Sequence, residues 1–191
     1  MHLIGVKHEI QSETTRLGLR LFFPCFPGGP MLHISQETPA DTQEVEYLYD
    51  LAFAPGRQAL SSYRLRDAVP PVAELCLVAR GEEGAVAGAI RYWPVLIGNH
   101  KALLLGPVAV HPTRQGEGVG GQLIGESLAL AEKFGWERVL LVGDAPYYKR
   151  FGFYLVSGVE MPPPTNPERV LGRALTDGAF KGVSGLVRPL A

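Results

Sequence analysis

The glycine-rich segment at residues 115–121, Gln-Gly-Glu-Gly-Val-Gly-Gly, contains the residue types that point most directly to chemistry. Glycine lets backbone N–H groups approach an anion closely, because no Cβ atom stands in the way. An amphipathic pattern follows the segment, and the first N–H groups of a helix are unpaired donors at the positive end of its dipole. The segment therefore predicts a site for a phosphate or pyrophosphate, although an ordinary glycine-rich turn has the same composition.

The elements predicted around this segment place it between a strand and a helix. Apolar residues typical of a strand cover 102–110, and apolar residues at helical spacing cover 118–134. The inward positions of this helix are expected to be Val119, Leu123, Ile124, Leu128, Ala131 and Phe134. A further strand is predicted at 138–142. The resulting strand–loop–helix–strand unit is long enough to form a parallel crossover.

The remaining pattern predicts an α/β fold with a mixed sheet of six or seven strands and helices on both faces. Before the loop we expect a strand at 31–35, a helix capped by Asp41 and ended by Pro55-Gly56, a short helix at 58–67, and strands at 74–80 and 85–97. After residue 142 we expect a short helix at 145–150 and strands near 153–156 and 169–175.

A dinucleotide is one candidate ligand for the glycine segment. Gly116-x-Gly118-x-x-Gly121 satisfies G-x-G-x-x-G, and Asp144 follows the next strand near the spacing of a ribose-binding acid. However, residues 111–115 separate the strand from the first glycine, and no repeated helix–strand units follow. An NAD(P)-binding protein is therefore the weaker interpretation.

The pantetheine-pyrophosphate of coenzyme A is the second candidate, and the sequence resembles a family that binds it. Gln115-x-x-Gly118-x-Gly120 matches the Q/R-x-x-G-x-G/A signature of the GCN5-related N-acetyltransferases, the GNAT superfamily. Residues 148–153, Tyr-Lys-Arg-Phe-Gly-Phe, resemble the family's Y-x-x-x-G-F element. The element order resembles the family over residues 31–175, and the segment 182–187 is similar to a bacterial branch of predicted acetyltransferases.

The resemblance implies acetyl transfer from acetyl-CoA to a primary amine, by direct attack in one ternary complex. Tyr148 would protonate the departing thiolate, as the catalytic residue. The pantetheine arm would lie along a free strand edge at Val108, Ala109 and Val110. The pyrophosphate would bind the loop residues Gln115, Gly116, Glu117, Gly118, Val119, Gly120 and Gly121.

Several of these residues also have plain structural roles. Val108 and Val110 are typical of core strand positions, and one of two adjacent tyrosines on a short helix is usually packing, the role we assign to Tyr147. Asp144 is suited to a helix N-cap, with Pro146 in the first turn and Gly152 as the stop. Arg114 is expected either near the 3′-phosphate or in solvent.

The general base is not identified by the sequence. The strand 102–110 has no carboxylate, whereas many family members place a glutamate there. Glu74, His33, His111 or a chain of water molecules would each serve. The missing carboxylate motivates an alternative function, a CoA-binding sensor or interaction module that has lost turnover.

Length and composition predict one globular domain preceded by an extension. The chain has 191 residues, of which 46% are hydrophobic and 19% charged. The proline- and glycine-rich run at 24–30 interrupts regular structure, so we expect an N-terminal extension at 1–30 and the acetyltransferase domain at 31–191. Met31 would then be an alternative start.

Charge and cysteine usage exclude several partners. A net charge of −1 argues against a nucleic-acid partner, and no run of 18 apolar residues predicts a membrane span. Cys25 and Cys76 form neither a disulfide framework nor a metal motif, so no metal is expected and free thiols in the cytoplasm are favoured. The acceptor is left open among polyamines, antibiotics, amino acids, lysine and protein N-termini, and so is a homodimer.

Overall fold

The structure is a computed structural model, and it describes residues 32–53, 56–67 and 69–190. The predicted extension at 1–30, its alternative start at Met31 and Cys25 lie outside the described residues. Cys76 is a free, buried thiol whose Sγ donates a hydrogen bond to the Val72 carbonyl at 3.3 Å. Burial raises the pKa of this thiol to about 11.

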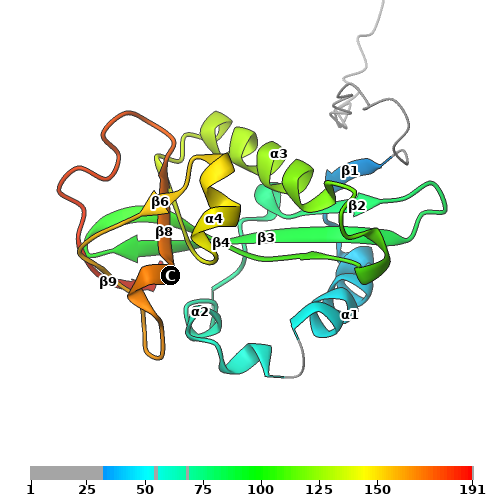
Figure 1. Ribbon diagram of the computed structural model, residues 1–191, viewed down its shortest axis with the longest axis horizontal. Helices are drawn as coiled ribbons and strands as arrows, with labels where there is room; N and C mark the ends of the chain where they lie inside the picture. Colours follow the sequence, from blue (N-terminus) through cyan, green and yellow to red (C-terminus); the bar gives the residue numbers. More distant parts are fainter. Residues whose placement is uncertain (1–31, 54–55, 68, 191) are drawn as a thin grey trace, which may run out of the picture.

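A mixed sheet with the order β1-β2-β3-β4-β5-β8-β6 forms the centre of the molecule (Figure 1). The first four strands form an antiparallel meander, and β4 pairs with β5 in parallel, which confirms the predicted crossover. The seven strands of this path are β1 (His33–Gln36), β2 (Leu77–Arg80), β3 (Val86–Ile97), β4 (His100–Val110), β5 (Arg138–Val142), β8 (Val170–Ala174) and β6 (Tyr154–Leu155).

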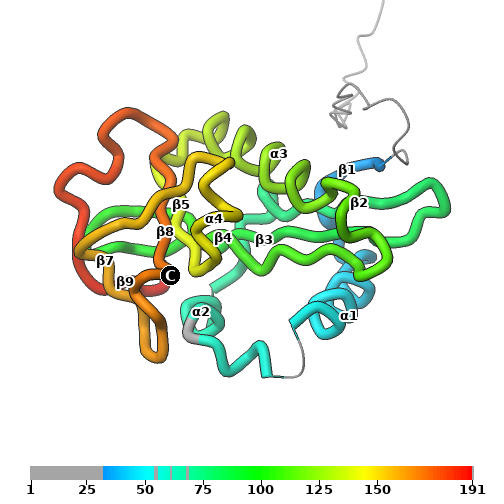
Figure 2. Tube along the Cα trace, viewed as in Figure 1, coloured from blue at the N-terminus to red at the C-terminus, as the bar shows by residue number. Residues whose placement is uncertain are grey.

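Two short strands were not predicted. The strand β9 (Gly185–Pro189) pairs with the far end of β3, and β7 (Val159–Glu160) pairs with β9. They lie together at one end of the sheet in Figure 2. Neither strand has the sustained alternation that signals a strand in a sequence. Their pairing depends on partners that are distant in the chain.

Helices cover both faces of the sheet, as predicted. On one face lie α1 (Thr42–Phe53) and α2 (Ser61–Arg64), and on the other α3 (Val119–Lys133) and α4 (Ala145–Tyr148). Within the described ranges, no helix is long and apolar enough to cross a membrane. Short 3-10 turns complete the chain at Pro39–Asp41, Arg57–Ala59, Ala73–Leu75, Pro112–Arg114, Lys149–Phe151 and Pro167–Arg169.

Asp41 begins α1 differently from the prediction. Its carboxylate accepts hydrogen bonds from both the backbone N–H and the hydroxyl of Thr38, each at 2.7 Å, and it pairs with Arg80. The carboxylate therefore closes the turn before the helix and does not cap its first N–H groups. Thr38 and Arg80 thus fix the position of the Asp41 carboxylate at the turn that precedes α1.

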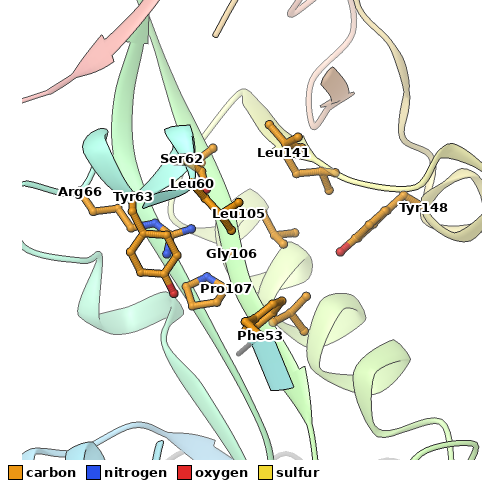
Figure 3. Close-up of a pocket in the computed structure, with 13 residues that line it drawn as sticks. Phe53, Leu60, Ser62, Tyr63, Arg66, Leu105, Gly106, Pro107, Leu141 and Tyr148 are labelled. Atoms are coloured by element: carbon orange, nitrogen blue, oxygen red, sulfur yellow. The ribbon is translucent and has the colours of Figure 1, made fainter. Parts of the chain in front are cut away.

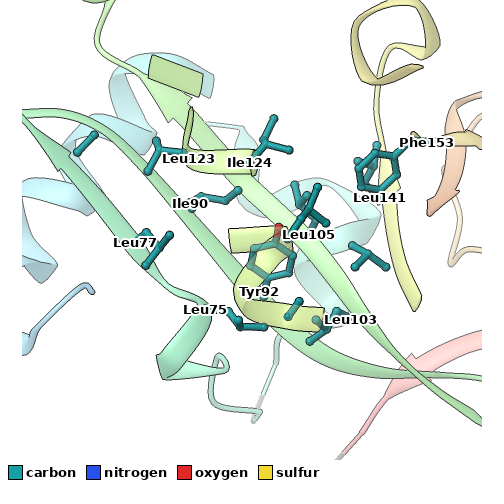
Figure 4. Packing of buried hydrophobic residues seen from close by; sticks show 14 of the residues in the cluster. Leu75, Leu77, Ile90, Tyr92, Leu103, Leu105, Leu123, Ile124, Leu141 and Phe153 are labelled. Carbon is teal, nitrogen blue, oxygen red and sulfur yellow. The ribbon is translucent and has the colours of Figure 1, made fainter. Parts of the chain in front are cut away.

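The face of the sheet under α3 is apolar (Figure 4). Leu123, Ile124 and Leu128 of α3 are buried against Tyr92 and Leu105 of the sheet, and each such side chain contributes roughly 1.5–3 kcal/mol by burial. Phe134, expected to face inward, is 52% exposed, because α3 ends at Lys133 and the chain turns away there.

The opposite face binds α1 through a buried apolar cluster, which includes Val45 and Leu48, and through ion pairs. Arg91 of β3 pairs with Glu37 and with Glu46 of α1. Arg57, in the turn after α1, donates to Glu46 at 2.6 Å and to Asp50 at 2.7 Å. Both faces of the sheet therefore have apolar packing, and the α1 face adds these ion pairs.

Candidate active site

The sheet opens between β4 and β5. These strands pair only at Leu103–Val139 and Leu104–Leu140, whereas β4 remains paired with β3 as far as Val110. The edge of β4 that faces β5 is therefore unpaired beyond Leu104 among the described residues. A bulge lies in the same stretch, because the register with β3 shifts between Ile90 and Tyr92.

The open edge presents the backbone of Val108 and Val110. The N–H of His111 donates to the Ala87 carbonyl of β3 at 2.9 Å. Because successive residues of a strand direct their N–H and C=O groups to opposite edges, Ala109 faces β3, while Val108 and Val110 face the gap. Of the three residues predicted to hold a pantetheine arm, two thus offer backbone groups to it.

The side chains of these three residues have packing roles as well. Val108 and Val110 are partly buried against the core under α3. The Ala109 side chain is 4% exposed and belongs to the cluster under α1. A ligand on the open edge would use backbone groups only, so both roles are compatible.

The glycine loop ends at the N-terminus of α3 with unpaired donors. Gly116 and Gly118 have φ values of +87° and +82°, which glycine adopts without strain. In the described part of the chain, the N–H groups of Gly116, Glu117 and Gly118 have no hydrogen-bond partner. The N–H groups of Val119, Gly120 and Gly121 are free by helix geometry, since the first helical bond runs from Gln122 to the Gly118 carbonyl at 3.0 Å.

The remaining predicted loop residues are placed differently. The N–H of Gln115 is directed at the Pro112 carbonyl at 3.5 Å, so it is turned away from the free donors. The Arg114 Nε atom lies 2.8 Å from the Glu117 Oε2 atom. Arg114 thus forms an ion pair across the loop and is not simply solvated.

Tyr148 faces a cavity of about 130 Å³ at the opening of the sheet (Figure 3). Its hydroxyl points into the cavity from the β5 side, opposite the side chains of Arg66 and Tyr63. Burial raises the pKa of Tyr148 to about 12, so the hydroxyl keeps its proton at physiological pH. The lining residues are Phe53, Leu60, Ser62, Tyr63, Arg66, Leu104, Leu105, Gly106, Pro107, Val108, Leu141, Val142 and Tyr148.

The Tyr148 ring is positioned by its neighbours. It packs edge-on against Tyr147 and Phe153, with ring centroids 5.0 and 5.8 Å apart. A Cβ atom on Gly143 would lie 2.4 Å from the Tyr148 Cε2 atom, so only glycine allows the ring to approach the end of β5. Tyr147 packs on Phe151 but is 38% exposed, so of the two tyrosines it is Tyr148 that packs against the core.

The loop, the strand edge and α4 meet at Gly120. A Cβ atom there would lie 3.2 Å from the Tyr147 hydroxyl and 3.3 Å from Val110 Cγ2. Asp144 occupies the N-cap position of α4 as predicted, but its side chain makes no capping hydrogen bond. Pro146 lies in the first turn, and Gly152 ends the following 3-10 turn at a φ of +79°.

None of the three proposed bases lies in the cavity. Glu74 and His33 are exposed on the β1–β2 side of the sheet, and His111 bonds to the Thr113 hydroxyl at 2.8 Å. The described lining contains neither a carboxylate nor a histidine. In the same described part of the chain, no group of three His, Cys, Asp or Glu residues is arranged to hold a metal ion.

The sequence analysis missed most of the cavity lining, including Phe53 and Arg66, and it also missed Gly143 beside Tyr148. Phe53 and Arg66 come from the α1–α2 region, which has no motif, and they reach the cavity only through the fold. Gly143 precedes Asp144 directly, and its role depends on where the Tyr148 ring lies. Its glycine type at a strand end was the one available signal.

Comparison with known proteins agrees with this geometry. Residues 73–155 match the acetyltransferase (GNAT) domain family, the class defined by the opened sheet and the glycine loop. The chain is 32% identical over 159 residues to the uncharacterized N-acetyltransferase YhbS of Escherichia coli K12, covering 81% of this chain and 93% of that protein. The chain belongs to the GNAT superfamily of acetyltransferases.

Two solved structures extend the likeness. The crystal structure of YhbS from Escherichia coli in complex with CoA has a TM-score of 0.73 and 29% identity, covering 88% of this chain and 94% of that one. A GNAT acetyltransferase from Brucella melitensis in complex with acetyl-CoA has a TM-score of 0.56 and 34% identity, covering 79% and 99%. Family membership and the antiparallel pairing of β8 beside β5 argue against the dinucleotide interpretation.

Proposed function

We propose that this protein transfers the acetyl group of acetyl-CoA to a primary amine by direct attack within one ternary complex. One observation carries the proposal: the open edge of β4 connects the unpaired N–H groups before α3 to the cavity that contains Tyr148. A long ligand with an anionic middle and a reactive end fits this layout. The complexes of the two relatives with CoA and acetyl-CoA support it.

Acetyl-CoA would be held mainly by backbone groups. The pyrophosphate would accept hydrogen bonds from the N–H groups of residues 116–121, at the positive end of α3. The pantetheine amides would pair with Val108 and Val110, as an added strand pairs with a sheet edge. This arrangement brings the thioester to the cavity beside Tyr148.

The chemistry then needs one nucleophile and two proton transfers. The amine nitrogen, in its neutral form, attacks the thioester carbonyl carbon, and the C–S bond breaks as the C–N bond forms. The departing thiolate takes a proton from the Tyr148 hydroxyl, which recovers one from solvent. The nitrogen loses its extra proton to water, because the described lining offers no carboxylate or histidine.

Ligand-dependent thermal unfolding tests the cofactor half of the proposal. At 100 times its Kd a ligand adds about 2.7 kcal/mol, which raises the Tm of a chain of this size by roughly 5–10 °C. We expect this shift with acetyl-CoA and CoA and none with NAD or NADP. A shift with a nicotinamide dinucleotide alone would overturn the proposal.

Turnover tests the catalytic half. Thiol release from acetyl-CoA is followed with a broad panel of amines, for the wild type, Tyr148→Phe and the control Tyr154→Phe, since the Tyr154 ring packs on Phe180 outside the cavity. We expect Tyr148→Phe to lower kcat by roughly 10²-fold or more while acetyl-CoA affinity is retained, and Tyr154→Phe to leave both near wild type. Binding of acetyl-CoA without turnover of any amine would favour the sensor function, which the missing β4 carboxylate also motivates.

A further inference from the structure

Arg66 is a cation in the cavity that has no anionic partner in the part of the chain that the structure describes. Its guanidinium lies 4.0 Å from the centroid of the Tyr63 ring and 4.7 Å from that of Trp93. Its Nε and Nη1 atoms are buried and have no hydrogen-bond partner. Figure 3 shows the side chain directed at β4 beside Gly106, on the opposite side of the cavity from Tyr148.

The neighbouring carboxylates are already paired with other arginines. Glu46 and Asp50 bind Arg57, and Glu37 binds Arg91 together with Glu46. No ion pair between described residues includes Arg66. Among the described residues that line the cavity, Arg66 is thus the one charged group, a guanidinium among mostly apolar side chains.

A buried charge without a counterion is costly, and the chain does not compensate it by neutralisation. Burial lowers the pKa of Arg66 to about 10, so the side chain stays charged at neutral pH. The Tyr63 and Trp93 rings offset part of the desolvation cost through cation–π contact. The Nη2 atom lies beside Gly106 and is the donor that an anion entering the cavity would meet first.

A carboxylate is the anion that this geometry suits. The guanidinium fork donates two parallel hydrogen bonds to a carboxylate, and such charge-assisted pairs are stronger in a site that excludes water. The Nη2 atom would lie 3.7 Å from a Cβ atom placed on Gly106. Gly106 precedes the Val108–Val110 edge directly, so a carboxylate held here lies close to the expected thioester end.

We propose that the amine acceptor carries a carboxylate bound by Arg66 and an apolar body, as in a small apolar amino acid. This proposal rests on the proposed acetyl transfer and narrows its acceptor class. Phe53, Leu60 and Leu141 provide the apolar wall, and the volume of about 130 Å³ suits a small molecule. Polyamines and aminoglycosides carry additional positive charges, which Arg66 would repel.

Arg66 also has a purely structural explanation, as a wedge between Tyr63 and Trp93. The two roles differ in what the substrate must contain. A wedge affects all acceptors equally through the fold. A carboxylate-binding residue affects only acceptors that have the carboxylate.

The test compares apolar amino acids with analogues that lack the charge. For the wild type we measure kcat/KM for L-leucine and L-phenylalanine, their amides, and the corresponding decarboxylated amines, within a panel of all the common amino acids. We expect the best amino acid to exceed its amide and amine by roughly 10- to 100-fold. Preference for an amide or a carboxylate-free amine would overturn the proposal.

Variants separate the two roles. Arg66→Gln should lower kcat/KM for the amino acid by roughly 10- to 100-fold while changing that for the amide less than about 3-fold. Arg66→Lys, which keeps the charge but not the fork, should retain part of the preference. The control is Arg64→Gln, two residues earlier at the end of α2, since Arg64 is exposed and donates to the Pro163 carbonyl outside the cavity. Equal losses for amino acid and amide would establish the structural role alone.

Equilibrium binding keeps the test independent of turnover. N-acetyl-L-leucine, N-acetyl-L-phenylalanine and their amides are titrated calorimetrically into wild type and Arg66→Gln, with and without free CoA. We expect the acids to bind wild type more tightly than the amides, and the difference to vanish in Arg66→Gln. If acetyl-CoA gives no thermal shift, acetyl transfer fails, whereas indistinguishable binding of acids and amides rejects the Arg66 proposal by itself.

Discussion

The two faces of the sheet both pack helices on apolar clusters, but they offer different groups to a ligand. Under α3 the groups offered to a ligand are backbone N–H groups of the glycine loop and of β4. Under α1 and α2, arginine–carboxylate pairs add to the apolar packing, and the groups that reach the cavity are side chains such as Arg66.

Backbone contacts and side-chain contacts to a ligand respond differently to substitution. A ligand held by backbone groups requires glycines at set positions but few particular side chains. Where side chains hold the ligand, substituting those side chains changes which ligand binds, while the sheet stays the same. We infer that the α3 face binds acetyl-CoA and that the α1–α2 face determines which acceptor amine binds.

The largest expected effect is on the stability of the α1 face. Arg91→Met leaves the Glu37 carboxylate, whose side chain is 9% exposed, without its main partner. Removing one member of a buried pair costs about 3–5 kcal/mol. We therefore expect urea unfolding to show a loss of that size in the free energy of unfolding.

The matched variant lies on the α3 face. Arg173→Met removes the ion pair with Glu132, a partly exposed pair at 3.1 Å, and the Arg173 hydrogen bond to the Phe151 carbonyl. Exposed pairs contribute little, so its cost should stay near 1 kcal/mol. Equal costs for the two variants would mean that the buried ion pair of the α1 face adds no more stability than the exposed pair near α3.

The next largest effect concerns the cofactor loop. Gly118→Trp places a large side chain over the unpaired N–H groups, where the present backbone has open space, and we expect acetyl-CoA affinity to fall by about 100-fold or more, near 2.7 kcal/mol. The positive φ of Gly118 adds a stability cost of roughly 1–2 kcal/mol. Calorimetric titration below the unfolding transition measures the affinity separately.

Gly125→Trp is the matched control for this change. Gly125 lies on the exposed side of the same helix, also with nothing near its Cβ position. It should leave acetyl-CoA affinity unchanged. If Gly118→Trp bound acetyl-CoA as the wild type does, the loop would not be the pyrophosphate site.

The sequence predicts the acetyl-CoA side of the site better than the acceptor side, because one is built from contiguous residues and the other is not. The loop, β4, α3 and β5 are contiguous in the chain, so hydrophobic periodicity and glycine spacing predicted their order and most of their bounds. Tyr148 was found because it belongs to a short motif. Backbone chemistry that depends on contiguous residues can be deduced from a sequence.

The acceptor side of the site could not be predicted in this way. Arg66 and Tyr148 are far apart in the chain, and nothing in the local pattern around Arg66 distinguishes it from an exposed arginine on a short helix. The strands β7 and β9 pair through contacts of high sequence separation. The inward assignment of Phe134 failed because periodicity does not reveal the residue at which a helix ends.

A smaller effect is expected from Gly143, as a positioning residue for Tyr148. Gly143→Ala forces the Tyr148 ring to move, because the new Cβ atom would overlap Cε2 and Cδ2. A displacement of this kind should lower kcat by roughly tenfold while the KM for acetyl-CoA stays near wild type. Gly125→Ala, which adds no contact, serves as the control.

A double variant tests whether Gly143 acts through the Tyr148 hydroxyl. If it does, Gly143→Ala combined with Tyr148→Phe should be no slower than Tyr148→Phe alone. Multiplicative losses would mean that Gly143 acts on the active site by another route. The cycle thus links a steric feature of the backbone to one hydroxyl group.

The smallest effect compares how the two long helices begin. Burial alone would raise the pKa of Asp41, but hydrogen bonds from Thr38 and Arg80 outweigh it and hold the pKa below its ordinary value. A lowered pKa means that the carboxylate stabilises the fold at neutral pH and loses this contribution as the pH falls through the folded-state value. Asp41→Asn should therefore lower the free energy of unfolding by about 1 kcal/mol at pH 6–7, and the gap to wild type should narrow toward pH 3.

The start of α3 has no such side chain, because Gly118 is its N-cap and makes no capping bond. Before α1, the Thr38 N–H donates to the Asp41 carboxylate. Before α3, the N–H groups of residues 116–118 have no partner among the described residues and are open to a ligand. Urea unfolding of wild type and Asp41→Asn across this pH range measures the gap. A gap that stayed constant with pH would show that Asp41 acts through packing, and the entry of α1 would then be no more dependent on charge than that of α3.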